Sequence, residues 1–352
     1  MKVCNSIFEK IEIDDSGETY FCCEGRVARF SIGNIFRQSF DEVWNSPIAI
    51  KMREKALQGE YPYCNAKVCH KLVNNIDEHF CEQQEHFQPI MQKGPTQISF
   101  PIDQDCSARC IFCRDDIRVA SEPQLHDLRY KLHNIYLPMC KDVEYLTVNN
   151  LGDAFSSRFS REFIKTISET YPHIKFVLMT NGISATKELI DSLGLPGKIK
   201  EFDISINAIN EKTHRKIFRI KGFKQLLKNL KYIAELKSQN KIDFLNFNFV
   251  ICKYNWKEMK PFIAFAKKHN AKINFWEVRD YSGAPLENNY ADMTVHREGD
   301  KGYNQFRRML CDKIFDDEDV VISPVIKKIR EDALTQYKST LLYKISNFLK
   351  LN

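Results

Sequence analysis

The sequence predicts an α/β fold: a partial (β/α)6 TIM-like barrel with a small cysteine-rich module before it and a helical extension after it. Three observations predict this organisation. Strand-like and helix-like segments alternate through the middle of the chain, which is the pattern of a parallel sheet whose crossovers are helices. Nine of the twelve cysteines lie in the first 113 of the 352 residues. The alternation stops at about residue 285. The predicted parts are therefore a module (1–88), a linker (89–95), a core (96–285) and a carboxyl-terminal extension (286–352).

The amino-terminal module is predicted to contain a hairpin and two short helices. Residues 14–17 are turn formers between two strand-like segments, so residues 10–21 are expected to form the hairpin. The helices are indicated by their first residues, because serine caps a helix and proline fits its first turn. These signals are a capping box of Ser39 with Glu42, and the pair Ser46-Pro47.

Four thiolates of this module could bind one metal centre. They are expected from Cys4, Cys22 or Cys23, Cys64 and Cys69. Consecutive residues in an extended segment point to opposite faces, and of the two adjacent cysteines we favour Cys22. This donor set suits zinc and a [4Fe-4S] cluster equally well. Cys81 is interpreted as a spare thiol.

The core is predicted from alternating periodicity. Apolar residues at helical spacing, among them Leu125, Leu128 and Leu132, indicate helices between the strands. The carboxyl ends of the strands are where ligands bind in parallel α/β folds. The predicted strands are 97–102, 143–148, 175–179, 201–206, 247–251 and 273–276. Besides the helix through Leu125, the predicted helices are 159–168, 186–193, 223–237 and 256–268.

A cysteine loop follows the first core strand. Cys106, Cys110 and Cys113 have the spacing C-x3-C-x2-C, which can give three thiolates to one iron-sulfur cluster and leave one iron without a protein ligand. Zinc binding is one alternative, although zinc usually takes four ligands. The other alternative is that these cysteines are inert thiols. A disulfide is disfavoured because no secretory signal precedes these cysteines.

Composition narrows the class of protein. The net charge of +6 is spread along the chain, which gives little support for a nucleic-acid partner. No apolar run approaches the roughly 20 residues needed to cross a bilayer, and no signal-like segment is present, so we expect a cytoplasmic protein. The final helix carries an apolar stripe that includes Leu334, Tyr337 and Leu341. This stripe could contact a membrane or a partner, but packing against its own protein is favoured.

The cysteine loop resembles the radical S-adenosylmethionine (SAM) superfamily, in which an aromatic residue holds the position of Phe112. The resemblance implies that the free iron binds SAM, and that an electron from the cluster cleaves SAM to a 5′-deoxyadenosyl radical that abstracts hydrogen from the substrate. Phe112 would lie near the adenine. Gly152 and Asp153 are placed like the family's Gly-Gly-Glu-Pro motif, although its other glycine and its proline are replaced. The same resemblance implies that further polar groups seat SAM: Ser205, Asn207 and Arg219.

The amino-terminal module is similar to the SPASM/twitch accessory domain, which holds auxiliary [4Fe-4S] clusters in many radical SAM enzymes. The similarity runs from Cys4 through the hairpin turn and the Ser39 helix to Cys69. Two departures are the position of the module before the core and a cysteine set that suffices for one auxiliary cluster. The resemblance thus implies that Cys4, Cys22, Cys64 and Cys69 hold that cluster.

The expected function is hydrogen abstraction from an unactivated C–H bond of a peptide or carbohydrate substrate. A fully ligated auxiliary cluster would favour net oxidation, because it can accept an electron from the substrate radical. The resemblance also implies an electron donor such as flavodoxin or ferredoxin. One alternative is a redox-neutral epimerase in which Cys252 returns the hydrogen atom. Another is a non-catalytic metal-binding scaffold or electron carrier.

Overall fold

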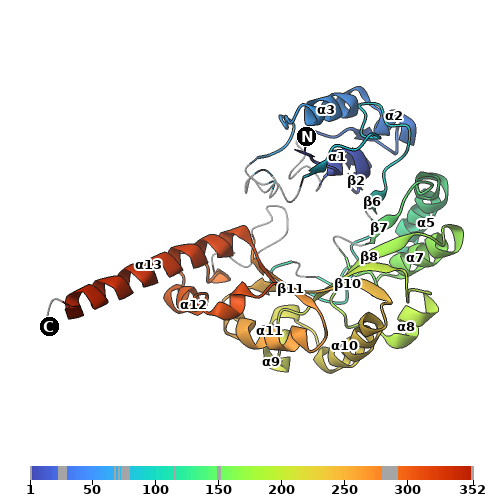
Figure 1. Ribbon diagram of the computed structural model, residues 1–352. Helices are drawn as coiled ribbons and strands as arrows, with labels where there is room; N and C mark the ends of the chain where they lie inside the picture. The colour runs from blue at the N-terminus through green and yellow to red at the C-terminus, as the bar shows by residue number, and fades with distance from the viewer. Residues whose placement is uncertain are drawn as a thin grey trace. The chain divides into compact units, whose positions relative to one another are not determined.

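A computed structural model describes residues 2–22, 30–66, 69, 72, 80–100, 102–113, 116–148, 152–279 and 292–349, with side chains described up to residue 336 (Figure 1). The chain divides into two compact units. The first comprises Met1–Cys106, Arg118–Met179 and Glu188–Glu201, and the second comprises Ser107–Ile117, Thr180–Lys187 and Phe202–Asn352.

The sheet of the first unit joins the predicted module to the predicted core. Its strand order is β8-β7-β6-β2-β3-β4. The hairpin strand β2 pairs in parallel with the first core strand β6, with Lys10 opposite Gln97, whereas β2 and β3 are antiparallel as the hairpin prediction required. Strands β6, β7 and β8 are mutually parallel neighbours. The bounds are β2 (Lys10–Ile13), β3 (Glu18–Tyr20), β4 (Gly33–Asn34), β6 (Gln97–Phe100), β7 (Tyr145–Val148) and β8 (Lys175–Thr180).

The short helices of the module begin where the sequence predicts. In α2 (Phe40–Trp44) the Ser39 hydroxyl accepts the Glu42 N–H while the Glu42 side chain accepts the Ser39 N–H, so the capping box is confirmed. In α3 (Pro47–Leu57) the Ser46 hydroxyl accepts the Ala49 N–H. A further helix, α1 (Ser6–Glu9), and a two-stranded sheet of β1 (Lys2–Val3) and β5 (Cys81–Glu82) complete the described part of the module.

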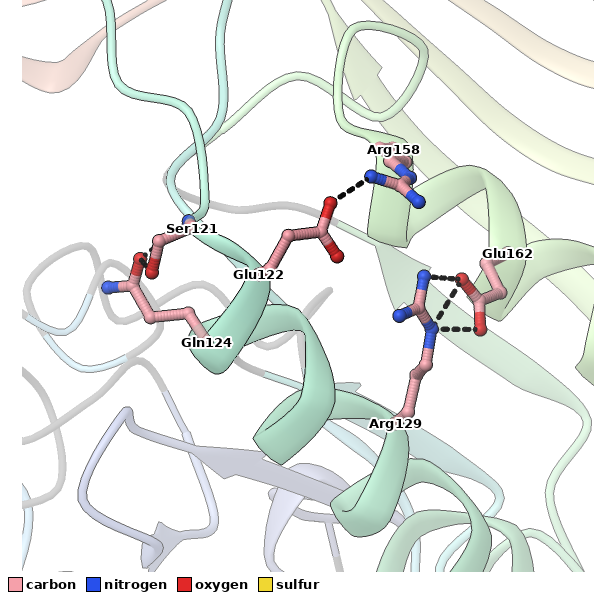
Figure 2. A network of polar contacts seen from close by, with 6 residues as sticks. All are labelled: Ser121, Glu122, Gln124, Arg129, Arg158 and Glu162. Atoms are coloured by element: carbon pink, nitrogen blue, oxygen red, sulfur yellow. Dashed lines mark hydrogen bonds and ion pairs between the residues drawn. The ribbon is translucent and has the colours of Figure 1, made fainter.

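Two helices of the first unit are joined by a partly exposed ion-pair network (Figure 2). The Arg129 guanidinium of α5 (Glu122–Lys131) donates to both carboxylate oxygens of Glu162 on α7 (Arg158–Thr170), at 2.8 to 3.0 Å. Arg158 pairs with Glu122 at 2.6 Å. In the same unit the Phe100, Tyr136 and Phe163 rings pack together. The other helices here are the π-helix η3 (Leu132–Tyr136), α6 (Leu137–Met139) and α8 (Lys187–Ser192).

The second unit continues the α/β pattern. Its strands follow the order β9-β10-β11-β12, of which β10, β11 and β12 are parallel. Aromatic rings of Phe247, Phe249, Phe262 and Phe275 form the layer between strands and helix α11. The strands are β9 (Ile199–Ser205), β10 (Ile242–Ile251), β11 (Lys272–Glu277) and β12 (Val320–Ile322). The helices are α9 (Glu211–Phe218), α10 (Phe223–Ser238), η4 (Trp256–Glu258), α11 (Met259–Lys267), α12 (Tyr303–Met309), η6 (Lys313–Asp316) and α13 (Pro324–Leu349).

The predicted α/β fold with a largely parallel sheet of the partial-barrel kind is confirmed. All six predicted core strands are present, with ends shifted by a few residues. Strand β12 extends the prediction, because the carboxyl-terminal extension adds a parallel strand beside β11 rather than only helices. The predicted final helix is present as α13, whose Ile326 and Ala333 are buried. None of the helices in the described parts of the chain is long and apolar enough to cross a membrane.

Candidate iron-sulfur and cofactor sites

The cysteine loop is fixed by main-chain hydrogen bonds within the second unit. The Arg109 N–H donates to the Phe218 carbonyl at 3.1 Å, and the Ile111 N–H donates to the Ile217 carbonyl at 3.0 Å. These acceptors are carbonyls of the last turn of α9, which no further helical turn would satisfy. The loop that carries Cys110 and its neighbours is therefore held by backbone groups, independently of any side chain.

The same turn of α9 carries Arg219, one of the predicted SAM-binding residues. Arg219 is the C-cap of α9 and has a left-handed backbone, with φ 56° and ψ 24°. A left-handed backbone costs a non-glycine residue about 1 kcal/mol or more. Because the Arg109 N–H is bound to the residue just before it, Arg219 lies at the turn on which the cysteine loop rests.

A second polar group reaches the cysteine loop from the loop after β8. The Asn181 side-chain amide donates to the Ser107 hydroxyl at 3.2 Å, and its oxygen accepts the Ile183 N–H at 3.0 Å. Asn181 is buried. This contact joins the loop after β8 to the cysteine loop.

The three cysteines are unequally exposed. Cys106 and Cys110 are half-buried and Cys113 is exposed, while the Cys113 N–H donates to the Cys110 carbonyl at 2.9 Å and closes a turn. Phe112 lies within this turn and is half-buried. Three soft thiolate donors on a loop with an accessible end suit iron-sulfur ligation.

Gly152 and Asp153 lie against the segment that leads into Cys106, within the first unit. A Cβ atom on Gly152 would stand 2.8 Å from the Asp105 carbonyl oxygen and 2.9 Å from that of Asp103, so only glycine fits. The Asp153 N–H donates to the Asp105 carbonyl at 2.8 Å, and its carboxylate accepts the Phe155 and Ser156 N–H groups. Both residues thus shape the loop after β7; their predicted role toward SAM stays a prediction.

Gly152→Ala is expected to destabilise this loop, because backbone carbonyls rather than flexible side chains stand in the way of the new methyl group. Overpacking of this kind costs about 1–3 kcal/mol. The free energy of urea unfolding is the measurement, with SAM affinity as a second readout. Gly94→Ala is the control, since a Cβ there would meet first the flexible Asp142 side chain at 3.3 Å. Equal unfolding free energies for the two variants would contradict the prediction.

Two carboxylates before Cys106, the half-buried Asp103 and the buried Asp105, were not singled out from the sequence. Burial raises the pKa of Asp103 to about 6, although the hydroxyl of Ser157, which donates to its carboxylate, opposes that rise. Asp105 is buried and accepts the Ala120 N–H at 2.7 Å. Both hold in place the segment that ends at Cys106. The detectable signal was the alternation Asp103-Gln104-Asp105-Cys106 immediately after a strand.

Asn207 and Asn255 connect the ends of β9 and β10. The Asn207 side-chain oxygen accepts the Val250 N–H at 2.7 Å, and its own carbonyl accepts the Asn255 amide at 2.9 Å. Asn207 also has a left-handed backbone, with φ 55°. Its amide oxygen is therefore engaged by the fold. The predicted contact of Asn207 and Ser205 with SAM stays a prediction, and the partner Asn255 was missed by sequence reasoning.

Cys252 is completely buried at the end of β10. Its N–H donates to the Asn255 side-chain oxygen at 2.8 Å. Burial raises the pKa of the Cys252 thiol to about 11. The side chain is consequently a protonated thiol at neutral pH, which is the form that can give a hydrogen atom.

His214 makes the stability of α9 depend on pH. Its ring is completely buried against Phe218 and Phe223, and neither ring nitrogen has a hydrogen-bond partner among the described residues. Burial lowers the pKa of His214 to about 4. Since the unfolded chain takes up this proton near pH 6.5, stability is complete above pH 6.5 and is lost as the pH falls toward 4, by roughly 2–3 kcal/mol.

His214→Phe is expected to remove this share of the acid destabilisation. The measurement is urea unfolding of the metal-free chain between pH 7 and pH 4, so that cluster loss does not contribute. His126→Phe, on the exposed face of α5, is the control and should keep the slope of the original chain. An unchanged slope in His214→Phe would refute the role of His214.

Two cysteines of the amino-terminal module donate backbone hydrogen bonds to Tyr61. The Cys4 N–H donates to the Tyr61 hydroxyl at 3.0 Å, and the Cys64 N–H donates to the Tyr61 carbonyl at 3.1 Å. Cys69 is buried, and Cys22 is half-buried. Cys23 lies outside the described residues. Within the described ranges, no three His, Cys, Asp or Glu side chains form a group that could hold a single metal ion. The thiolates of a [4Fe-4S] cluster bind different irons and therefore stand further apart than the ligands of one ion.

Fold and cysteines together define the class: a largely parallel α/β protein that carries a cysteine-rich module at its amino-terminal side. Residues 4–70 match the family model of the SPASM iron-sulfur cluster-binding domain. The chain thus contains a SPASM iron-sulfur domain, here on the amino-terminal side of the core. Thiolates are the ligands such clusters use, and the matched segment contains Cys4, Cys22, Cys64 and Cys69, whose role as ligands stays a prediction.

Similarity to known proteins is otherwise low. No curated protein matches the chain. Among solved structures it is similar to SuiB of Streptococcus suis bound to S-adenosylmethionine, at 14% identity and a TM-score of 0.43, over 80% of this chain and 60% of that one. The complex of SuiB with the precursor peptide SuiA is 13% identical in sequence, with a TM-score of 0.44, over 92% of this chain and 73% of that one. The complex of anSMEcpe with AdoMet and the Kp18Cys peptide is 12% identical in sequence, with a TM-score of 0.39, over 64% of this chain and 63% of that one. This chain therefore spans less than two thirds of the first SuiB structure. The fold of this chain is defined by the strand order of its own sheet.

Proposed function

We propose that the chain is a radical SAM enzyme that abstracts a hydrogen atom from an unactivated C–H bond of a peptide or carbohydrate. The main support is the cysteine loop, whose C-x3-C-x2-C spacing follows the first core strand and whose backbone rests on the turn that carries Arg219. The SPASM match over residues 4–70 supports the same class. The core boundaries, 96–285, belong to this proposal.

Each group has a proposed role. Cys106, Cys110 and Cys113 hold the catalytic cluster. When bound, the cluster and SAM together supply a radical that removes hydrogen from the substrate. Arg219 pairs with the SAM carboxylate. The remaining residues orient SAM and exclude water: Phe112, Gly152, Asp153, Ser205 and Asn207.

The auxiliary cluster is proposed to accept an electron from the substrate radical. If every iron has a protein ligand, that cluster binds no substrate, and electron transfer is the role left to it. Net oxidation follows. An external donor of the flavodoxin or ferredoxin kind would supply the electron for SAM cleavage.

A polar ladder across the second unit supports a polar substrate. The Asp203 carboxylate on β9 accepts the side-chain amides of Asn246 at 3.1 Å and Asn248 at 3.3 Å. Asn248 in turn accepts the Asn274 amide of β11 at 3.0 Å. Burial raises the pKa of Asp203, while the two amides oppose the rise. Hydrogen-bonding groups of this kind recognise hydroxyl or amide groups, which both peptides and carbohydrates present.

Anaerobic reconstitution tests the proposal. The expected result is about eight irons per chain, two [4Fe-4S] clusters, and reductive cleavage of SAM to 5′-deoxyadenosine. Bound zinc without SAM cleavage would contradict the proposal and support the scaffold alternative. Candidate peptides and oligosaccharides, tested as substrates, should increase the yield of 5′-deoxyadenosine if they are bound productively.

The buried thiol favours one second candidate, a redox-neutral epimerase that uses Cys252 as hydrogen donor. For net oxidation, Cys252→Ala should keep turnover within a few-fold of the original chain, and product made in D2O should carry no deuterium at the reacting carbon. Cys140→Ala, at another completely buried cysteine, controls for packing loss. Loss of turnover in Cys252→Ala alone, with solvent deuterium in the product of the original chain, would instead establish the epimerase.

A further inference from the structure

Tyr61 lies where three cysteine-bearing segments of the first unit meet. Its hydroxyl accepts the Cys4 N–H at 3.0 Å, and its carbonyl accepts the Cys64 N–H at 3.1 Å. Its ring packs against that of Phe80, with centroids 5.5 Å apart. Phe80 is the neighbour of Cys81. One side chain and its backbone therefore contact the segments of Cys4, Cys64 and Cys81.

Strand pairing places Cys81 beside Cys4. Strands β1 and β5 are antiparallel, with Val3 opposite Cys81. Paired residues of antiparallel strands have Cα atoms about 4.5–5.5 Å apart, so the residue after Val3, which is Cys4, is a near neighbour. The Cys81 sulfur contacts the Val3 carbonyl at 3.7 Å. Cys81 is half-buried and lies on the same side of the module as the Cys4 segment with which its strand pairs.

We propose that Cys81 is a ligand of the auxiliary cluster together with Cys4 and Cys64, and that Tyr61 is the positioning residue of all three. This inference rests on the proposed auxiliary [4Fe-4S] cluster. In such a cluster each thiolate binds a different iron, and the fourth iron is left to Cys22 or Cys69. Cys81 lies beyond the 4–70 segment that matches the SPASM model. This proposal replaces the interpretation of Cys81 as a spare thiol.

The test uses the full chain with Cys106, Cys110 and Cys113 changed to alanine, so that only the auxiliary cluster is counted. This background is expected to bind about four irons after anaerobic reconstitution and to give the EPR signal of a reduced [4Fe-4S] cluster. Adding Cys81→Ser should reduce the iron to about half or less, or convert the signal to a [3Fe-4S] type. Adding Cys311→Ser should change neither. Cys311 is a matched control, because it is half-buried and its sulfur also contacts a carbonyl at 3.7 Å.

Two further measurements keep the outcome interpretable. The metal-free forms of the background and of Cys81→Ser are compared by far-UV circular dichroism and thermal unfolding, and equal values assign the iron loss to the lost ligand. Should Cys81→Ser fail to fold, Cys81→Asp takes its place, and it should retain iron with an altered EPR signal. Tyr61→Phe keeps the ring and the backbone contact, so it should retain the iron and shift the reduction potential of the cluster.

The results separate this inference from the proposed function. Four irons and an unchanged EPR signal in Cys81→Ser would overturn the role of Cys81 while leaving the auxiliary cluster intact. An unchanged reduction potential in Tyr61→Phe would overturn the positioning role of Tyr61. A background without iron would instead overturn the auxiliary cluster itself, and this inference with it.

Discussion

Replacing Cys110 and Cys113 together by alanine is expected to abolish the formation of 5′-deoxyadenosine from SAM. The remaining Cys106 could not hold a cluster alone, and without a cluster no electron reaches SAM. The iron content should fall from about eight to about four per chain, because the auxiliary cluster does not use these residues. Iron analysis and chromatographic assay of 5′-deoxyadenosine are the measurements.

The design of this experiment separates loss of ligand from loss of fold. The loop is held by the backbone N–H groups of Arg109 and Ile111 on the last turn of α9, and alanine leaves these bonds in place. The metal-free variant should therefore unfold at the temperature of the metal-free original chain. Cys311→Ala, away from both cysteine groups in sequence, should keep all the iron and the full rate. SAM cleavage that survives in the double variant would refute the catalytic site.

Arg53→Ala is expected to cause the largest loss of stability, about 3–5 kcal/mol. Arg53 on α3 is completely buried, and its guanidinium lies over the ring of Trp44 at 4.2 Å and that of Phe21 at 4.9 Å. It donates to the carbonyls of Ile7 at 3.3 Å and Pro89 at 3.2 Å. Truncation removes these bonds and leaves a cavity in the module.

Two variants refine the test of Arg53. Arg53→Met keeps most of the volume and loses the hydrogen bonds, so its unfolding free energy should lie between those of Arg53→Ala and the original chain. Arg37→Ala, at an exposed position, should change stability little. Denaturant unfolding of the metal-free chain is the measurement. A loss in Arg53→Ala no larger than that in Arg37→Ala would refute the structural role.

Local signals predicted much of this fold correctly. The hairpin of β2 and β3, the capping box at Ser39 and the proline-started helix α3 each depend on residues only a few positions apart. The alternation of core strands and helices was visible for the same reason, because each element has its own periodicity. These parts of the structure follow from neighbouring residues.

Contacts between distant residues could not be predicted in the same way. Strand β12 is a run of three apolar residues after an acidic turn, and only its pairing with β11 makes it a strand. Cys81 lies opposite Val3, the neighbour of Cys4, through a two-residue strand pairing, and Val3 and Cys81 are 78 positions apart. The bond between Asn181 and Ser107 is equally non-local. In each case the local sequence allows several structures, and tertiary packing selects one.

The candidate site was predicted residue by residue only where a resemblance to a family pointed to it. The chemistry of the cysteine loop follows from its spacing, whereas the partly or fully buried positions of the Asp103 and Asp105 carboxylates become visible only when their surroundings are known. A carboxylate in a sequence is normally a surface residue. Here Asp103 accepts the Ser157 hydroxyl and Asp105 accepts the Ala120 N–H, and these donors lie 54 and 15 positions further along the chain.

The parallel pairing of β2 with β6 has a consequence for biosynthesis and for truncation. Strand β2 leaves the ribosome long before its partner, since Lys10 pairs with Gln97, and until then it can bond only to the rest of its hairpin. A chain shortened to begin after the linker would present β6 with one row of bare N–H and C=O groups. Such an uncovered edge can pair with strands of other molecules, so we expect the shortened chain to aggregate.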